Sequence, residues 1–247
     1  MTSANQTRFN AEAAAWDSNP SVLLASDLAH KAILERLPGR ETTSLLDVLE
    51  IGCGTGLLSL ALAPSFRSLT AVDAADGMIE ALQAKLDAED CAIRNVRAVC
   101  AMLEDPDDER IRPDAAAGSR AQDGKALEPR RFDLVVSHLV LHHIPELLPV
   151  IRTMFGCLKP GGQVMLTDFE DFGPEARRFH PESKMEGVER HGIKRTEMEA
   201  LLLQAGFADV RVETAFEMDK AIETELGSGV NGPTMTFPFL VCMGKKP

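Results

Sequence analysis

The stretch Glu50-Ile51-Gly52-Cys53-Gly54-Thr55-Gly56 decides the fold, because three closely spaced glycines follow an apolar run over 45–51. The run predicts a β-strand, and residues 57–63 predict a helix that Pro64 ends. Glycines at such a strand-to-helix turn let the backbone approach a ligand without a Cβ in the way. The spacing is GxGxG, whereas a dinucleotide site of the GxGxxG form needs a glycine at the position of Leu57.

Short apolar runs alternate with helical stretches along the rest of the chain. This alternation is typical of a parallel sheet built from βαβ units, so we predict a single α/β domain over 1–247 with seven strands and helices on both faces. The further strands are predicted at 69–72, 96–100, 132–137, 163–167, 210–213 and 239–242, and the further helices at 77–88, 146–158 and 196–205.

Two segments fall outside this alternation. Residues 1–40 contain a helical stretch around 22–37 ahead of the first strand, and we interpret them as a lid on the outside of the sheet. Residues 105–131 hold seven acidic and six basic residues without a hydrophobic period. We interpret them as a flexible, solvated insertion between the third and fourth strands.

The amino-acid composition limits the classes of partner and the compartment that we expect for this protein. The 26 Lys and Arg against 38 Asp and Glu give a net charge of −12, which argues against nucleic acid or an anionic membrane surface. No apolar run approaches the ~20 residues of a membrane-spanning helix. The polar first six residues do not resemble a secretory signal. Five scattered cysteines without a CxxC pair indicate reduced thiols, and together these features predict a cytoplasmic protein.

Asp73 supports the interpretation of the glycine turn as part of a cofactor site. It ends the second predicted strand, 17 residues after Gly56, where an acidic side chain can accept both hydroxyls of a cofactor ribose. The alternative is that Asp73 caps the following helix, a place for which Asp76 competes.

These motifs together resemble the class I S-adenosylmethionine-dependent methyltransferases. Residues 49–56 resemble the first motif of that family, and Val72-Asp73 with Met78 is similar to the second. Residues 132–137 with 141–144 resemble the fourth-strand motif, and 158–162 the turn before the fifth strand. The resemblance covers about 45–206 and implies a Rossmann-like, mostly parallel sheet whose last strand is antiparallel.

The ends of the chain resemble a ubiquinone/menaquinone-methyltransferase-like subgroup that acts on small molecules. Phe9-Asn10 with 14–17 is similar to its N-terminal segment, and Phe179-His180 with His191-Gly192 to a stretch that lines the substrate side. The 105–131 insertion is a departure from these relatives.

The resemblance implies S-adenosyl-L-methionine as the cofactor. Met78 and Trp16 could instead be packing residues, and Met102 and Leu103 stand where many relatives have an acidic residue. The implied cofactor-binding residues are Glu50, Gly52, Cys53, Gly54, Gly56, Asp73, Ala74, Met78, Met102, Leu103, Ser137 and Trp16.

Histidines are the candidates for catalysis. Methyl transfer is an in-line displacement that needs alignment and water exclusion, and a general base only when the nucleophile is protonated. We predict His142, His143 and His191 as general base or substrate-positioning residues. His138, His142 and His143 are clustered, and a spacing of four residues can place two ligands on one helical face. No metal is expected, because no glutamate or third ligand nearby completes that pattern.

The predicted function is therefore transfer of a methyl group from S-adenosylmethionine to an O, N, S or C nucleophile of a small organic molecule. One alternative is a catalytically inactive S-adenosylmethionine-binding or partner-regulating module. Another, an NAD(P)-dependent oxidoreductase, is disfavoured by Leu57 in the glycine motif and by the absence of any Tyr.

Overall fold

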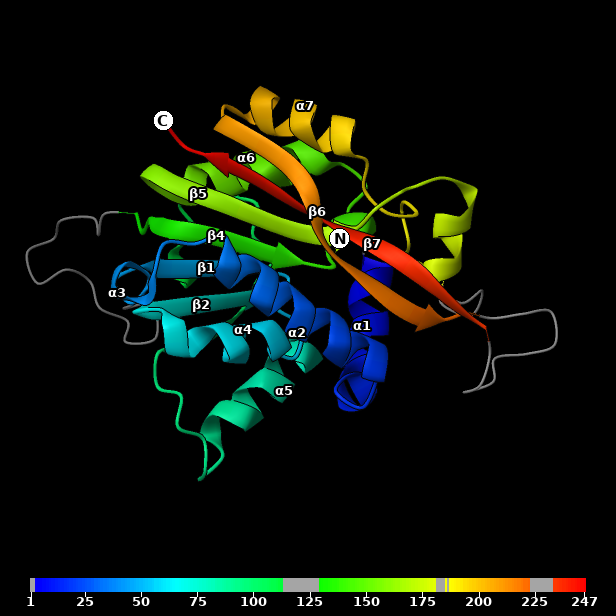
Figure 1. The fold of residues 1–247 in the computed structure, drawn as a ribbon. Helices are drawn as coiled ribbons and strands as arrows, with labels where there is room; N and C mark the ends of the chain where they lie inside the picture. Colours follow the sequence, from blue (N-terminus) through cyan, green and yellow to red (C-terminus); the bar gives the residue numbers. More distant parts are fainter. Residues whose placement is uncertain (1–2, 113–128, 181–184, 186, 223–232) are drawn as a thin grey trace, which may run out of the picture.

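A computed structural model describes residues 3–112, 129–180, 185, 187–222 and 233–247 (Figure 1). Its elements, with η for a 3₁₀ helix, are α1 (Ser3–Trp16), α2 (Pro20–Glu35), α3 (Arg40–Thr43), β1 (Asp47–Ile51), α4 (Leu57–Leu62), η1 (Ala63–Ser65), β2 (Ser68–Asp73), α5 (Asp76–Asp87), β3 (Val96–Cys100), η2 (Glu109–Ile111), β4 (Phe132–His138), η4 (Leu141–His143), α6 (Leu147–Cys157), β5 (Leu158–Phe169), η5 (Pro174–Phe179), α7 (Arg195–Ala205), β6 (Ala208–Ala221) and β7 (Thr234–Lys245).

One sheet of seven strands organises the molecule, in the order β3-β2-β1-β4-β5-β7-β6. The pairs among β1 to β5 are parallel, whereas β7 runs antiparallel to both β5 and β6. The predicted fold class is confirmed, including the antiparallel last strand. The order reverses between β1 and β4, which places their carboxyl ends at the crevice where open α/β sheets bind ligands.

The two faces of the sheet have separate cores. On one face Val48, Leu134 and Ala71 pack with residues of α2, α4 and α5, among them Ile33 and Leu62. On the other face, the alternate residues of the same strands pack with α6 and α7 (Figure 1). Consecutive strand residues serve opposite faces because side chains alternate along a strand, and both faces are apolar because helices cover both.

The last three strands differ most from the prediction. The segment Lys159-Pro160-Gly161-Gly162, expected as a turn before a strand at 163–167, lies within β5 as an irregularity in its pairing with β4. It stays in the sheet because the backbone N–H of Gly161 donates to the carbonyl of Lys246, and Lys246 N–H donates to Gly162. β6 and β7 are also much longer than predicted and form an extended antiparallel ribbon (Figure 1).

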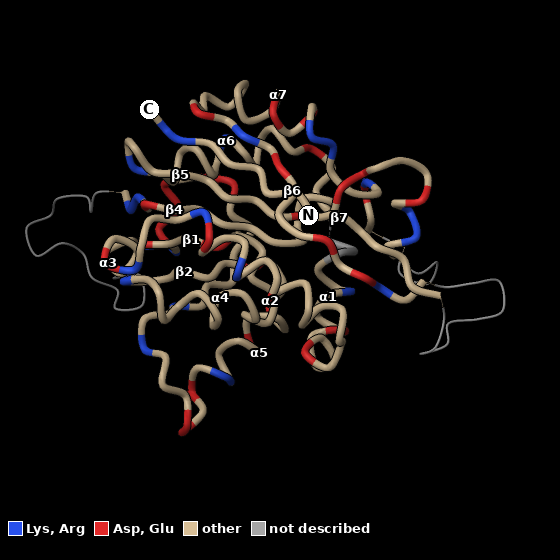
Figure 2. The backbone as a smooth tube through the Cα atoms, viewed as in Figure 1, with Lys and Arg blue, Asp and Glu red and all other residues tan. Residues whose placement is uncertain are grey.

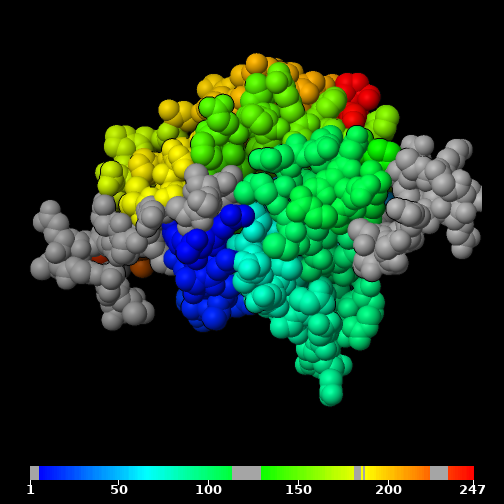
Figure 3. Space-filling model, turned by 180° about the vertical axis from the view of Figure 1, so that it is seen from behind, coloured from blue at the N-terminus to red at the C-terminus, as the bar shows by residue number. Residues whose placement is uncertain are grey.

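The N-terminal segment holds more helix than predicted. α1 precedes the expected helix, and in the space-filling view it lies at the surface against the part of the chain that carries α5 (Figure 3). Most of the 105–131 insertion, residues 113–128, lies outside the described residues. Among the helices that the structure describes, none is both long and apolar enough to span a bilayer.

Candidate functional site

The glycine loop between β1 and α4 has the backbone that the sequence predicts. Gly52, Gly54 and Gly56 all have positive φ, at 76°, 53° and 83°. A Cβ at Gly52 would lie 2.3 Å from Cγ2 of Val140, and one at Gly56 would lie 2.3 Å from Cδ1 of Leu82. Both conformation and space therefore require glycine at these two positions.

Asp73, at the end of β2, ties the glycine loop to the start of α5. One carboxylate oxygen accepts the backbone N–H of Gly54 at 2.8 Å, and the other accepts that of Ala75 at 2.9 Å. Burial raises the pKa of Asp73, against these backbone hydrogen bonds, which lower it. Asp73 is not the cap of α5, because the N-cap residue of that helix is Ala75, which makes no side-chain cap, and Asp73 lines both cavities described below.

Glu50, at the carboxyl end of β1, is a buried carboxyl group in the floor of the site. Its side chain is 1% exposed, and Oε2 accepts the hydroxyl of Ser59 at 2.5 Å. Burial raises the pKa of Glu50 to about 8, the Ser59 hydrogen bond opposes that rise, and the charge of Asp73 adds to it. A cation bound beside Glu50 would favour the carboxylate form of this group.

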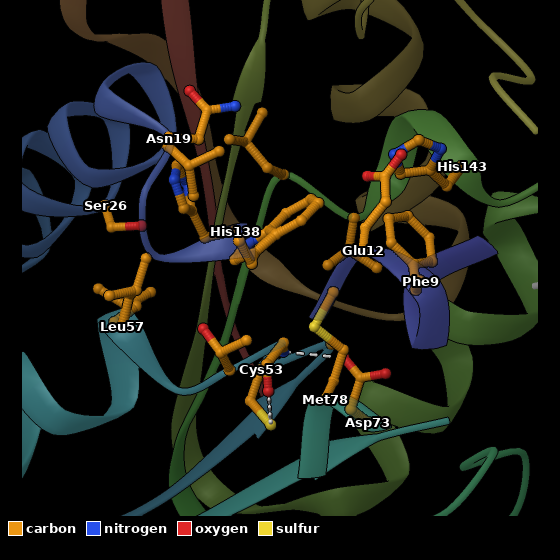
Figure 4. A pocket seen from close by; sticks show the side chains of 18 of the residues that line it. Phe9, Glu12, Asn19, Ser26, Cys53, Leu57, Asp73, Met78, His138 and His143 are labelled. Carbon is orange, nitrogen blue, oxygen red and sulfur yellow. Dashed lines mark hydrogen bonds between the residues drawn. The ribbon is translucent and has the colours of Figure 1, made fainter. Parts of the chain in front are cut away.

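Two cavities meet at the glycine loop and share Gly52, Asp73 and Val140 in their walls. The first has about 1290 Å³ of empty space, its open mouth included, against about 1080 Å³ for the second, and in this sense we call it the larger cavity. Among the predicted cofactor residues it is also lined by Glu50, Cys53, Gly54, Met78 and Trp16. The smaller is lined by Ala74, Met102 and Leu103. Figure 4 shows Cys53, Asp73 and Met78 together on one side of the larger cavity.

Two predicted cofactor residues lie in neither cavity wall. Ser137 is 1% exposed and its hydroxyl donates to the carbonyl of Ile51 at 2.7 Å, so it joins β4 to β1. Gly56 packs against Leu82 and turns the chain into α4. The motifs predicted both residues as cofactor-binding, but whether a residue faces the cavity depends on how the neighbouring strands and helices pack.

Helix α1 is held over the site by polar contacts at both of its ends. Asn10 Oδ1 accepts the backbone N–H of Gly77 at 3.0 Å, and Gln6 donates to the carbonyl of Ala74 at 3.1 Å. Just after the helix, Asp17 accepts the hydroxyl of Thr55 at 2.5 Å and pairs with Lys85. The helix consequently presents Phe9, Glu12 and Trp16 to the larger cavity.

His138, at the end of β4, is a site residue that the sequence prediction omitted. Thr167 donates its hydroxyl to the carbonyl of Ser137 at 3.4 Å, and its Oγ1 lies 2.9 Å from Nδ1 of His138. Because a hydroxyl has one proton, Oγ1 accepts from a protonated Nδ1, which leaves the lone pair on Nε2. Nε2 is buried and has no hydrogen-bond partner among the described residues. Burial lowers the pKa of His138 to about 4, so the ring is neutral.

The other cavity histidines come from two segments. His142 and His143, in η4, have ring centroids 3.9 Å apart, and His180, just after η5, lies 5.0 Å from His142. Figure 4 shows His138 on the side of Asn19 and Ser26, and His143 beside Phe9 and Glu12. Together His138, His142, His143 and His180 form what we name the histidine wall of the larger cavity.

His142 is held by a buried carboxylate. Its Nδ1 lies 2.9 and 3.0 Å from the two oxygens of Asp168, a residue with no exposed surface. Burial alone would raise the pKa of Asp168, but the neighbouring His142 lowers it, helped by backbone N–H groups of His142 and Phe169. Nothing in the sequence around Asp168 marked this role, since it depends on β5 lying beside β4.

His191 does not join the histidine wall. It was predicted beside His142 and His143, but it lines neither of the two cavities. His180, from the same predicted wall segment, does reach the cavity. The expected pocket segment is therefore divided, with one of its histidines in the site and the other outside it.

The sheet order, the glycine loop and the acidic ends of β1 and β2 define a Rossmann-like fold of the class I methyltransferase type. The methyltransferase domain family matches residues 22–212, which is most of the chain. The protein belongs to this methyltransferase family. The predictions of a methyltransferase, and of S-adenosylmethionine as the cofactor of its class, are confirmed at the level of the family.

Individual relatives are distant. The chain is 28% identical over 164 residues to malonyl-[acyl-carrier protein] O-methyltransferase of Priestia megaterium, a match that covers 66% of this chain and 50% of that protein. It is 31% identical over 120 residues to ubiquinone biosynthesis O-methyltransferase of Xanthomonas campestris, covering 49% of this chain and 41% of that one. The chain thus spans about half or less of these two relatives.

Solved structures show the same fold. The N-methyltransferase NodS of Bradyrhizobium japonicum, in complex with S-adenosyl-L-homocysteine, superimposes with a TM-score of 0.58 at 17% identity and covers 98% of each chain. At this identity the likeness establishes the architecture alone.

Proposed function

We propose that the protein transfers a methyl group from S-adenosylmethionine to a small organic molecule bound against the histidine wall. The nucleophile is an O, N, S or C atom, and oxygen is favoured because the two relatives described above are O-methyltransferases. The observation that carries the proposal is one continuous cavity with acidic and glycine-loop groups at one end and buried, neutral His138 at the other.

The residues present fit the cofactor. Glu50 and Asp73 are buried acceptors for an ammonium group and for ribose hydroxyls. Beyond its chain neighbours, a Cβ at Gly54 would have only Trp16 within 4 Å among the described residues, so this part of the loop leaves space for a ligand beside the backbone. Apolar groups in the smaller cavity, such as Met102 and Leu103, suit an adenine ring. When bound, S-adenosylmethionine supplies an electrophilic methyl group on a sulfonium that leaves as a neutral thioether.

The chain's own part is positioning, water exclusion and proton acceptance. Phe9 and Trp16 of α1 cover the cavity, and we propose that the 1–40 segment acts as a lid held by the contacts of Asn10 and Asp17. His138 Nε2 accepts the hydrogen of a protonated nucleophile, and the ring becomes an imidazolium as the proton leaves the acceptor. His142, steadied by Asp168, helps position the acceptor.

Charge and thiol state support the remaining parts of the proposal. Lys and Arg are interspersed with Asp and Glu along the chain, which supports a small acceptor rather than nucleic acid (Figure 2). All five cysteines are free, and three are buried. That arrangement supports a reducing, cytoplasmic environment.

Titration calorimetry and turnover test the proposal together. S-adenosylhomocysteine should bind with a micromolar-range Kd, while NADH should not bind; the reverse result would overturn the proposal. Release of S-adenosylhomocysteine is then measured with a panel of phenols, thiols and amines. Tight binding without turnover on any acceptor would favour the inactive-module alternative.

A further inference from the structure

Two adjacent histidines and a third that is distant in sequence converge at one end of the larger cavity. One ring nitrogen from each of His142, His143 and His180 lies within 4.8 Å of the other two. The prediction of no metal rested on the lack of a third ligand near His138 and the 142–143 pair. The fold removes that reason, because it brings His180, which follows η5, beside His142 and His143.

The rings of His142 and His143 are oriented by partners behind them. Asp168 accepts from Nδ1 of His142, and the carbonyl of Gly187 lies 2.8 Å from Nδ1 of His143. Carboxylate and carbonyl partners on one ring nitrogen are the usual outer shell of metal-binding histidines, since they fix the tautomer with the lone pair on the other nitrogen. Both orienting groups are therefore in place for rings that present Nε2.

His180 completes the set with a buried nitrogen. Its Nδ1 is buried and has no hydrogen-bond partner among the described residues. An unsatisfied buried nitrogen next to two oriented imidazoles is unfavourable unless a ligand binds there.

The charged groups around the three histidines are compatible with a bound cation. Asp168 contributes a buried negative charge directly behind His142. Two cations also line the cavity, but Arg8 pairs with Glu12 at 3.2 Å, and Lys220 donates to the carbonyl of Phe179. Three imidazoles suit zinc, copper, iron or nickel better than magnesium or calcium, which prefer oxygen.

We propose that His142, His143 and His180 form a binding site for a divalent transition-metal ion of the zinc type, with its open coordination position facing the larger cavity. Zinc–nitrogen bonds of about 2.0–2.1 Å put tetrahedral ligands about 3.4 Å apart, so small ring rotations would close the site. The metal site rests on the histidines alone. Only its role rests on the proposed function: the open position would select acceptors that offer a coordinating oxygen or nitrogen.

Direct metal binding tests the site without any assay of activity. The purified full-length protein is stripped with a chelator and titrated with Co²⁺, whose visible absorption reports ligand number, and with Zn²⁺ in competition with a chromophoric chelator. We expect one equivalent to bind. His180→Ala should weaken Zn²⁺ binding by more than about 100-fold, and Asp168→Asn by about 10–100-fold, the range for outer-shell partners.

The controls separate a metal site from a structural role. His30→Ala removes a histidine on α2 that lines neither cavity and should leave binding unchanged. His180→Ala removes no hydrogen bond that the structure describes at Nδ1, so the variant should fold, and circular dichroism checks this. Absence of stoichiometric Co²⁺ and Zn²⁺ binding, or equal binding by His180→Ala, overturns the proposal.

Cofactor binding distinguishes failure of this inference from failure of the proposed function. S-adenosylhomocysteine affinity is measured on the same stripped and metal-loaded samples. If S-adenosylhomocysteine binds and the metal does not, the metal site is wrong and the proposed function stands. If the metal binds and S-adenosylhomocysteine does not, the proposed function is wrong and the three-histidine site stands.

Discussion

The two ends of the larger cavity are assembled in different ways. The cofactor end comes from the strand ends and turns of β1 and β2, where the parallel pairing sets Glu50 beside Ala71 and Ile51 beside Val72. The histidine wall comes from β4, η4 and the residue after η5, and it is braced by Thr167 and Asp168 of β5. One end is thus encoded locally and the other depends on the assembled sheet.

The largest expected effect comes from Glu50, the most deeply buried group at the cofactor end. Its folded pKa of about 8 lies above the ordinary value of 4.5, so the native state binds more protons than the unfolded state between these values. Stability should therefore fall as pH rises from about 4.5 to about 8. Over this whole pH range the free energy of unfolding should fall by about 5 kcal/mol, at 1.36 kcal/mol per pKa unit.

Urea unfolding at several pH values measures this effect, with Glu50→Gln as the matched variant. Glutamine keeps the shape and a hydrogen bond from Ser59 but does not titrate in this range. The difference in unfolding free energy between the two proteins should grow with pH. A difference that stays constant from pH 5 to pH 8 would mean that Glu50 is not held as the neutral acid.

Asp73→Ala is the next largest change and tests the cofactor end directly. It removes a buried acceptor of two backbone N–H groups and, on the proposed function, the partner of the ribose hydroxyls. We expect a loss of S-adenosylhomocysteine affinity of about 3 kcal/mol, more than 100-fold in Kd. Calorimetry measures it, with exposed Asp76→Ala as the control. Equal affinity of the two variants would remove Asp73 from this role.

His138 tests the acceptor end. His138→Gln retains an acceptor near the cavity but cannot take up a proton, so on the proposed function it should lower kcat by about 100-fold, the lower range for general-base loss. The KM for the acceptor and the affinity for S-adenosylhomocysteine should change little. These constants are measured with whichever panel acceptor supports turnover. A fall in affinity with unchanged kcat would make His138 a binding residue only.

The difference between the two ends also explains what the sequence could predict. The glycine loop and Glu50 lie in one motif and Asp73 in a second, 17 residues after Gly56, so the βαβ pattern was enough to place them at one site. Asp168 and His180 carry no such local pattern, and their positions follow from β5 pairing with β4 and from the chain returning after η5. His191 shows the same limit, because it lies in the predicted wall segment but lines neither cavity.

Ser137 offers the smallest effect and the sharpest contrast between motif and structure. The motif predicts a cofactor contact, whereas its hydroxyl donates to the carbonyl of Ile51 and lines neither cavity. Ser137→Ala should therefore lower stability by about 1 kcal/mol, or roughly 2–4 °C in Tm for a chain of this size. Because Ser137 lines neither cavity, the affinity for S-adenosylhomocysteine should change by no more than about twofold. A tenfold loss would correspond to about 1.4 kcal/mol of binding free energy. Thermal unfolding and calorimetry on the same sample measure both, and a large loss of affinity at unchanged Tm would return Ser137 to the cofactor end. A lower Tm with almost unchanged affinity would show that Ser137, at the end of β4, holds the two central strands together. Glu50 and His138 then face the cavity from fixed positions.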